Sequence, residues 1–162
     1  MSIFFWYGGD VQGDATHEGY KGWIEITDFG WEINREITTR SGSAVNREAK
    51  EPRIGNVFMS KPIDSSSAGL AKEALRDKQG RDVKIAFVAT DAEGQGQEYL
   101  ALKLYNALIS KLDIRCSADG RPTEQLRIDF TKYEQTFKFM AQDNVAASPM
   151  TIGYDIATAK MS

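Results

Sequence analysis

The single histidine and the single cysteine of the chain restrict the catalytic chemistry that it could perform. A Ser-His-Asp or Cys-His site would have to use His17, which lies between Thr16 and Glu18 in a polar stretch. Cys116 follows Arg115, and a neighbouring cation favours the reactive thiolate form. No serine or cysteine stands in the Gly-x-Ser-x-Gly context of a nucleophile turn. We therefore expect His17 to be solvated and Cys116 to be half-buried, both without a catalytic role. A hydrolase built on this pair ranks third among the functional hypotheses for this chain.

Metal and nucleotide sites also lack the residues that they need. One histidine and one cysteine cannot form a thiolate zinc site, which leaves only a site made of oxygen ligands. Asp10, Asp14 and Glu18 supply oxygens, but their spacing does not match a calcium-binding loop. Gly94-Gln95-Gly96 lacks the third glycine and the Lys-Ser/Thr pair of nucleotide-binding loops. We expect no catalytic residue, no metal site and no cofactor, and therefore a protein that is not an enzyme.

The composition is that of a folded, acidic protein. The chain has 162 residues, of which 41% are hydrophobic and 27% are charged, a balance that disfavours long disorder. Its 20 Lys and Arg residues against 23 Asp and Glu residues give a formal net charge of −3. A nucleic-acid binder that relied on bulk positive charge would not have this balance. The length predicts a single domain that spans residues 1–162.

The first ten residues differ from an export signal. Their apolar run, residues 3–7, has no basic residue before it and is followed by Gly8-Gly9-Asp10 rather than by a small-residue cleavage site. No stretch approaches the roughly 20 apolar residues that span a bilayer. We expect synthesis in the cytoplasm without a cleaved signal peptide, and no membrane insertion.

Most apolar residues recur with a period of two, which predicts strands. The run at residues 3–7 is apolar on both faces. Such a strand is buried on both sides, in a core or in a contact between subunits. Two later runs change parity, around Thr27-Asp28 and between Phe130 and Tyr133. A slip of one residue sends every following side chain to the other face, so each change predicts a β-bulge or a bend into a second sheet.

Residues 64–80 carry a helix pattern. Asp64-Ser65-Ser66-Ser67 offers N-cap candidates, and Gly80 is a candidate stop. The predicted apolar stripe consists of Leu70, Ala71, Ala74 and Leu75. We expect one short helix that lies against the outside of a sheet or barrel.

Residues 99–114 fit both a helix and a strand. Helix propensity favours a helix. However, Leu102 would fall outside the helical stripe, and the turn at residues 91–96 requires a partner strand. We therefore predict a strand.

Residues 41–53 show no apolar period and are expected to form a long exposed loop. Such a loop is either functional or a disordered surface excursion. Together, these elements predict a mainly β fold: a compact β-barrel of two bent antiparallel sheets with one flanking α-helix and a long extended loop.

Several stretches resemble the haemolysin-coregulated protein (Hcp) family, the tube subunit of bacterial type VI secretion systems. The best stretch runs from Phe58 to Leu70 and is similar to the family's entry into its single helix. Shorter similarities follow in family order: Trp23-Ile24-Glu25-Ile26, Phe29-Gly30-Trp31, Tyr99-Leu100, Leu102-Lys103-Leu104, Thr123-Glu124 and Gly153-Tyr154-Asp155. The family commonly has a histidine shortly before the Trp-Ile position, where this chain has Tyr20.

The resemblance implies that six copies close into a ring and that rings stack into a hollow tube. In the family, the tube is built inside a contractile sheath in the cytoplasm and is then expelled, with effectors carried in its lumen. The implied partners are other copies of the chain, the spike protein, the sheath and baseplate, and secreted effectors. The resemblance implies no enzymatic activity and no cofactor.

We expect two segments to make the contacts between copies. Ring closure is assigned to the first strand, through Ile3, Phe4, Phe5, Trp6 and Tyr7. Ring stacking is assigned to the polar loop, through Ser41, Asn46, Arg47, Glu48, Lys50, Glu51 and Arg53. Two alternatives stay open from the sequence: a monomeric β-barrel that binds a small apolar ligand in its interior, and a phage tail tube protein.

Overall fold

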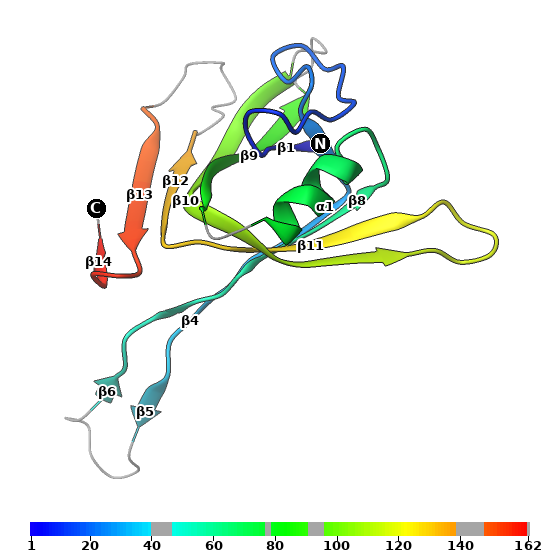
Figure 1. Cartoon of the computed structure of the whole chain (residues 1–162). Helices are drawn as coiled ribbons and strands as arrows, with labels where there is room; N and C mark the ends of the chain where they lie inside the picture. The colour runs from blue at the N-terminus through cyan, green and yellow to red at the C-terminus, as the bar shows by residue number, and fades with distance from the viewer. Residues whose placement is uncertain (40–46, 77–78, 91–95, 139–147, 162) are drawn as a thin grey trace.

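The structure, a computed structural model, describes residues 1–39, 47–76, 79–90, 96–138 and 148–161 (Figure 1). Ser41, Asn46 and residues 91–95 of the turn predicted at residues 91–96 lie outside the described residues. The elements in chain order are β1 (Ser2–Trp6), β2 (Ile24–Ile26), β3 (Asp28–Gly30), β4 (Ile33–Asn34), β5 (Ile37–Thr39), β6 (Arg47–Ala49), β7 (Arg53–Ile54), β8 (Val57–Pro62), α1 (Ser67–Leu75), β9 (Arg81–Thr90), β10 (Gly96–Arg115), β11 (Thr123–Asp129), β12 (Lys132–Phe137), β13 (Met150–Asp155) and β14 (Lys160–Met161).

In the described residues, the fold is mainly β and antiparallel with one helix, as predicted. Strand β10 is 20 residues long and belongs to two sheets. Its first half pairs with β9 and β12, and its second half pairs with β11 (Figure 1). The predicted strand at residues 99–114 is therefore confirmed, because pairing with three neighbours outweighs the helix propensity of its Leu, Ala and Lys residues.

Both predicted changes of parity mark the passage of the chain from one sheet to the other. At the first, β2 pairs with β1 and β3 pairs with β8, while the backbone N–H of Thr27 donates to the Ser60 carbonyl over 2.8 Å. At the second, β11 lies between β8 and β10, whereas β12 joins β10 to β13. The described ladders wrap around one core, but they do not close into a complete barrel, since β2 forms a ladder with β1 and not with β8.

The inner faces of both sheets enclose an apolar cluster. Phe29 on β3 packs edge-on against Phe87 on β9, with ring centroids 4.9 Å apart, and so links the two sheets. The fully buried members are Phe5, Ile24, Val57, Met59, Leu70, Val83, Ile85, Leu104, Ala107, Leu126 and Ile128. A filled interior of this kind explains why the alternating residues predicted the strands well.

Helix α1 is shorter than the sequence predicts. Leu70 is its buried residue, but Leu75, predicted to lie on the apolar stripe, is 89% exposed. The stripe prediction was wrong at Leu75 because the helix ends there and Arg76 adopts an extended conformation. Gly80 is therefore not the stop, and Ser66 makes no side-chain cap hydrogen bond although it holds the N-cap position.

Gly80 instead packs against the corner of β10. Asn106 has a positive φ of 52° at the point where the pairing of β10 with β9 shifts register. A Cβ atom on Gly80 would clash with the backbone carbonyl of Asn106, so this position has room only for glycine. Asparagine tolerates the left-handed conformation better than most residues do, which suits it to this corner.

A buried ion pair attaches the beginning of α1 to the sheets. Lys61 on β8 and Glu124 on β11 are 0% and 1% exposed. Their Nζ and Oε2 atoms lie 2.7 Å apart. Lys61 Nζ also contacts Asp64 Oδ1 at 2.8 Å and donates to Ser67 Oγ over 3.2 Å. Buried charges are tolerated when every polar group has a partner, and here those partners come from β8, β11 and α1 together.

We predict that Lys61→Met destabilises the protein by about 3–5 kcal/mol, because the buried carboxylate of Glu124 and the partly buried one of Asp64 would lose their cation. Lys61→Met combined with Glu124→Leu should recover part of this loss, since it removes both members of the central pair. Urea unfolding of both variants measures the difference. A double variant no more stable than Lys61→Met would contradict the prediction.

The corner of β10 gives a second prediction. Asn106→Val should lower the free energy of unfolding by about 1–3 kcal/mol, because a β-branched residue is strained at positive φ. Asn106→Gly serves as the matched control, since glycine adopts this conformation without strain. Equal unfolding midpoints for the two variants would show that the left-handed conformation is not the constraint.

Candidate assembly surfaces

A two-stranded arm, residues 33–39 and 47–54, projects away from the sheets (Figure 1). β4 pairs with β7 near the sheets, and β5 pairs with β6 farther out. The prediction of a loop without regular structure was therefore wrong for residues 47–49 and 53. An apolar period is absent here because Ile54 packs against the core while Ile33 and Ile37 are exposed, so the described part of the arm has no continuous buried face. The pairing rests mainly on backbone hydrogen bonds.

Trp31 lies just before the arm and fixes its base. The Trp31 ring packs edge-on against Tyr133 of the core, with centroids 4.7 Å apart. Its Nε1–H donates to the Gly55 carbonyl over 3.1 Å, and the Gly55 N–H donates to the Glu32 carbonyl over 2.9 Å. One aromatic residue thus holds the outgoing and returning strands of the arm together.

The residues assigned to ring stacking lie along this arm where the structure describes them. Lys50, Glu51 and Arg53 are exposed, and the backbones of Arg47 and Glu48 belong to β6. Ser41 and Asn46 are not among the described residues. Charges of both signs alternate along the exposed part of the arm, and Lys50 pairs with Glu36 at 2.9 Å.

The residues assigned to ring closure are mostly buried within the chain itself. Phe5 and Tyr7 belong to the core, being 0% and 2% exposed, and Phe4 is 1% exposed on the other face of β1. Trp6 is 36% exposed, and Ile3 is partly buried. Of the five residues, therefore, Trp6 and Ile3 are the ones that offer surface to another molecule.

The segment after β1 covers Phe4. Tyr20 stacks on the Phe4 ring with centroids 4.7 Å apart, and its hydroxyl donates to Glu98 Oε2 over 3.1 Å. Burial, with a smaller contribution from Glu98, raises the pKa of Tyr20 to about 12. His17 lies against the same ring, with centroids 5.4 Å apart, so it is half-buried rather than solvated as expected. Tyr20 thus covers Phe4 and supports β1 from this side.

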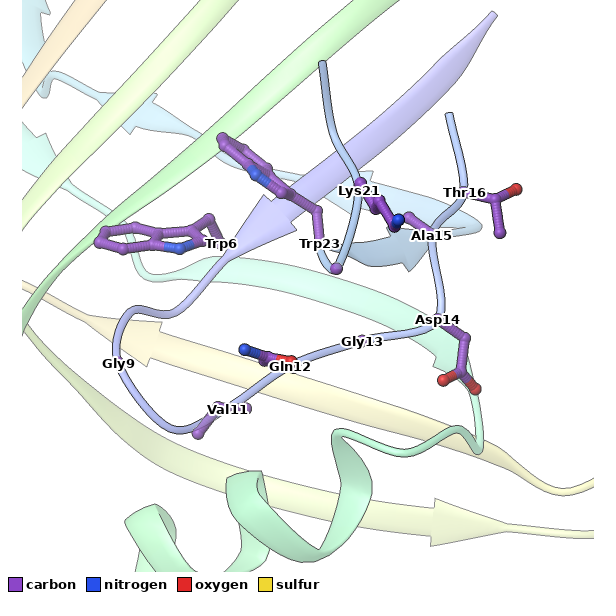
Figure 2. A pocket seen from close by; sticks show the side chains of 11 residues that line it. Trp6, Gly9, Val11, Gln12, Gly13, Asp14, Ala15, Thr16, Lys21 and Trp23 are labelled. Carbon is purple, nitrogen blue, oxygen red and sulfur yellow. The ribbon is translucent and has the colours of Figure 1, made fainter. Parts of the chain in front are cut away.

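A surface pocket of about 410 Å³ lies beside Trp6. Figure 2 shows Trp6 and Trp23 on one side and the backbone of residues 9–16 on the other. Asp14 accepts hydrogen bonds from the hydroxyl and the backbone N–H of Ser65, at 2.6 and 3.3 Å, and these bonds lower its pKa. Asp14 therefore binds the residues that precede α1. No cluster of metal-ligating side chains occurs among the described residues.

Cys116 lies after β10 in the connection to β11 and is exposed, not half-buried as predicted. Its thiol contacts the carbonyls of Ser117 and Gly120 in the same turn. His17, by contrast, packs against Phe4 of β1. The described contacts do not bring these two residues together into a nucleophile-base pair.

A further exposed surface at the edge strand β13 was missed by the sequence reasoning. Met150 and Ile152 are 56% and 44% exposed, and Met161 on β14 is 77% exposed. β14 pairs only with Tyr154 and Asp155, so in the described residues Met150–Gly153 is paired on the β12 side alone. Apolar side chains beside an unpaired strand edge favour contact with another chain. The alternation of β13 in the sequence gave no indication that its apolar residues face outward.

Comparison with known proteins identifies the family. The family model described as "Type VI secretion system effector, Hcp" matches residues 4–137. The chain belongs to the Hcp family. A comparison with curated proteins finds no sequence match.

Solved Hcp structures share the fold along nearly the whole chain. A structure described as that of a type six secretion system protein has a TM-score of 0.88 at 18% identity and covers 99% of both chains. Hcp1 from Salmonella typhimurium has a TM-score of 0.77 at 22% identity, covering 99% of this chain and 98% of its own. Hcp3 from Pseudomonas aeruginosa has a TM-score of 0.64 at 16% identity, covering 95% and 97%. Within the described residues, no helix has the length and apolar character needed to cross a membrane.

We predict that Trp31→Ala loosens the base of the arm. Limited digestion with trypsin should then cut faster after Arg35, Lys50 and Arg53, because local opening exposes these sites more often. Trp31→Phe is the matched control, since it keeps a ring against Tyr133 and loses only the hydrogen bond to Gly55. Equal cleavage rates in all three proteins would show that Trp31 does not fix the arm.

Proposed function

We propose that this protein is a structural subunit of the inner tube of a type VI secretion system. Six copies close into a ring, and rings stack into a hollow tube. The observation that carries the proposal is the match of the Hcp family model to residues 4–137, together with a fold shared over nearly the full length of Hcp structures.

Ring closure by head-to-tail contact requires two different surfaces on each subunit. One candidate is the outer face of β1 with Trp6, and the other is the β13 edge with Met150 and Ile152. At the β1 surface the exposed ring has a neighbouring charge, since Lys84 Nζ lies 5.8 Å from the Trp6 ring centroid. We propose that the β1 surface of one copy meets the β13 edge of the next.

We propose that the arm makes the contacts between stacked rings. Its exposed residues Arg35, Glu36, Lys50 and Glu51 carry both signs of charge, so arms of neighbouring rings can pair without net repulsion. Each exposed ion pair contributes only about 0–1 kcal/mol. Stacking therefore depends on the repetition of weak contacts around a ring, and the small net charge of −3 keeps repulsion between copies low.

The proposal includes a secretion route and a set of partners. The subunit is made in the cytoplasm, is expelled with the tube without a cleaved signal peptide, and carries effectors in the lumen. Its other partners are the spike protein and the sheath and baseplate, and it has no catalytic activity. Support for this part comes from family membership.

The alternative of a monomeric ligand-binding barrel is disfavoured by the filled interior. Core residues from both sheets, such as Phe5, Leu104 and Leu126, are 0% exposed and pack in one cluster. A phage tail tube protein would need the same subunit shape, and the Hcp family model favours the secretion tube over it.

The assembly is tested by light scattering after size exclusion, followed by negative-stain microscopy. We expect a particle of six times 18.0 kDa and rings with six-fold symmetry. A strict monomer at high protein concentration would overturn the proposal.

Deletion of residues 43–51 tests the role of the arm. Rings should persist while stacking into tubes is lost, because the deletion removes β6 and leaves both sheets intact. An unchanged unfolding midpoint serves as the control for folding. Tubes that form as readily as those of the unmodified protein would remove stacking from the functions of the arm.

A further inference from the structure

The pairing of the arm changes register partway along its length. Ile33 is opposite Ile54 in the base, and Ile37 is opposite Ala49 in the outer half. Three residues lie between the two paired positions on the outgoing strand, but four lie between them on the returning strand. The returning strand therefore contains one extra residue within residues 50–52. An extra residue of this kind is a β-bulge, which bends a strand and increases its local twist.

The base of the arm is fixed to the core. Trp31 packs against Tyr133 and bonds to Gly55, and Gly55 bonds back to Glu32. A Cβ atom on Gly55 would lie 2.9 Å from Glu32 Cγ, so the strands approach closely at this point. The part of the arm before the bulge is thus held by buried aromatic packing as well as by backbone hydrogen bonds.

The outer half is connected across the bulge by exposed polar contacts. Arg35 Nε donates to the Lys50 carbonyl over 2.8 Å, and the Lys50 N–H donates to the Glu36 carbonyl over 3.1 Å. Lys50 Nζ and Glu36 Oε2 lie 2.9 Å apart, with side chains 68% and 63% exposed. Such a pair contributes about 0–1 kcal/mol. Ile37 in the outer half is 58% exposed, and an isolated two-stranded ribbon is marginally stable in water.

We propose that this bulge, residues 35–36 with residues 50–52, is a joint on which the outer half of the arm pivots relative to its fixed base. The pivot lets the outer half align with a second copy of the chain during stacking. This role rests on the proposed self-assembly, but the joint itself is a property of the single chain.

The register identifies a variant that removes the joint. Lys50 already lies opposite Glu36, so deletion of Glu51 would place Pro52 opposite Arg35 and give both strands equal length. Lys50 and Glu36 form a hydrogen-bonded position, so Pro52 would fall at the next, non-hydrogen-bonded one. There the missing N–H of proline costs no ladder bond. The matched control is Glu51→Ala, which loses the same charge and keeps the extra residue.

Distances between pairs of spin labels test the joint in the isolated subunit. The background carries Cys116→Ser, because that cysteine is exposed. One label pair joins Thr38→Cys in the outer half to Asp129→Cys on β11, and a reference pair joins Asn34→Cys in the base to the same position. We expect a broad distance distribution for the outer pair and a narrow one for the base pair. Deletion of Glu51 should narrow the distance distribution of the outer label pair to the width seen for the label pair in the base. Glu51→Ala should leave the outer distribution broad.

Three results would overturn the joint. The first is that the outer and base label pairs both give narrow distance distributions. The second is that the distance distribution of the outer pair stays broad after deletion of Glu51. The third is that both label pairs give broad distance distributions. Failure of the protein to form rings or tubes would instead count against the proposed function, because the measurement on the isolated subunit does not depend on assembly. In assembled samples, with labelled chains diluted into unlabelled ones, the distance distribution of the outer label pair should narrow even when Glu51 is present.

Discussion

The fold depends on the path of β10 through both sheets. A strand that pairs with β9 and β12 along one half and with β11 along the other must turn between them while its backbone groups stay paired. The turn is made by Asn106 in the left-handed conformation and is accommodated by Gly80, which has no side chain to occupy the same space. The chain changes sheet at Thr27 and again between β11 and β12, on either side of this corner. The two sheets can therefore share one core because a single strand belongs to both.

The strand pattern of this fold was predictable from the sequence because alternation reports burial directly. Both changes of parity marked real transfers between sheets, and residues 99–114 formed a strand although their composition favours a helix. Errors arose where burial depended on distant parts of the chain. Leu75 has the spacing of a buried residue but lies at the exposed end of α1, and Phe4 is covered by Tyr20 from a segment with no regular pattern.

The surfaces proposed for assembly were harder to predict than the core. An exposed apolar residue such as Ile152 has the same sequence pattern as a buried one, and only the pairing of β13 on a single side distinguishes them. The arm gave the opposite difficulty, since its described strands pair without a continuous buried face and so leave no apolar period. The burial of Lys61 was also not predicted, because a lysine side chain is usually exposed. Its side chain points inward because it has the same parity on β8 as Val57 and Met59.

The separation of the arm from the core affects how such chains diverge. Among the described residues, Ile54 in the base of the arm packs against the core, whereas Ile37 in the outer half is exposed, so substitutions in the described outer half carry little penalty in folding. Under the proposed assembly, selection on these residues acts through the fit to an identical neighbour. Two related subunits present in one cell could then evolve arms that no longer recognise each other. Each would build its own polymer without mixing, while both kept the same fold.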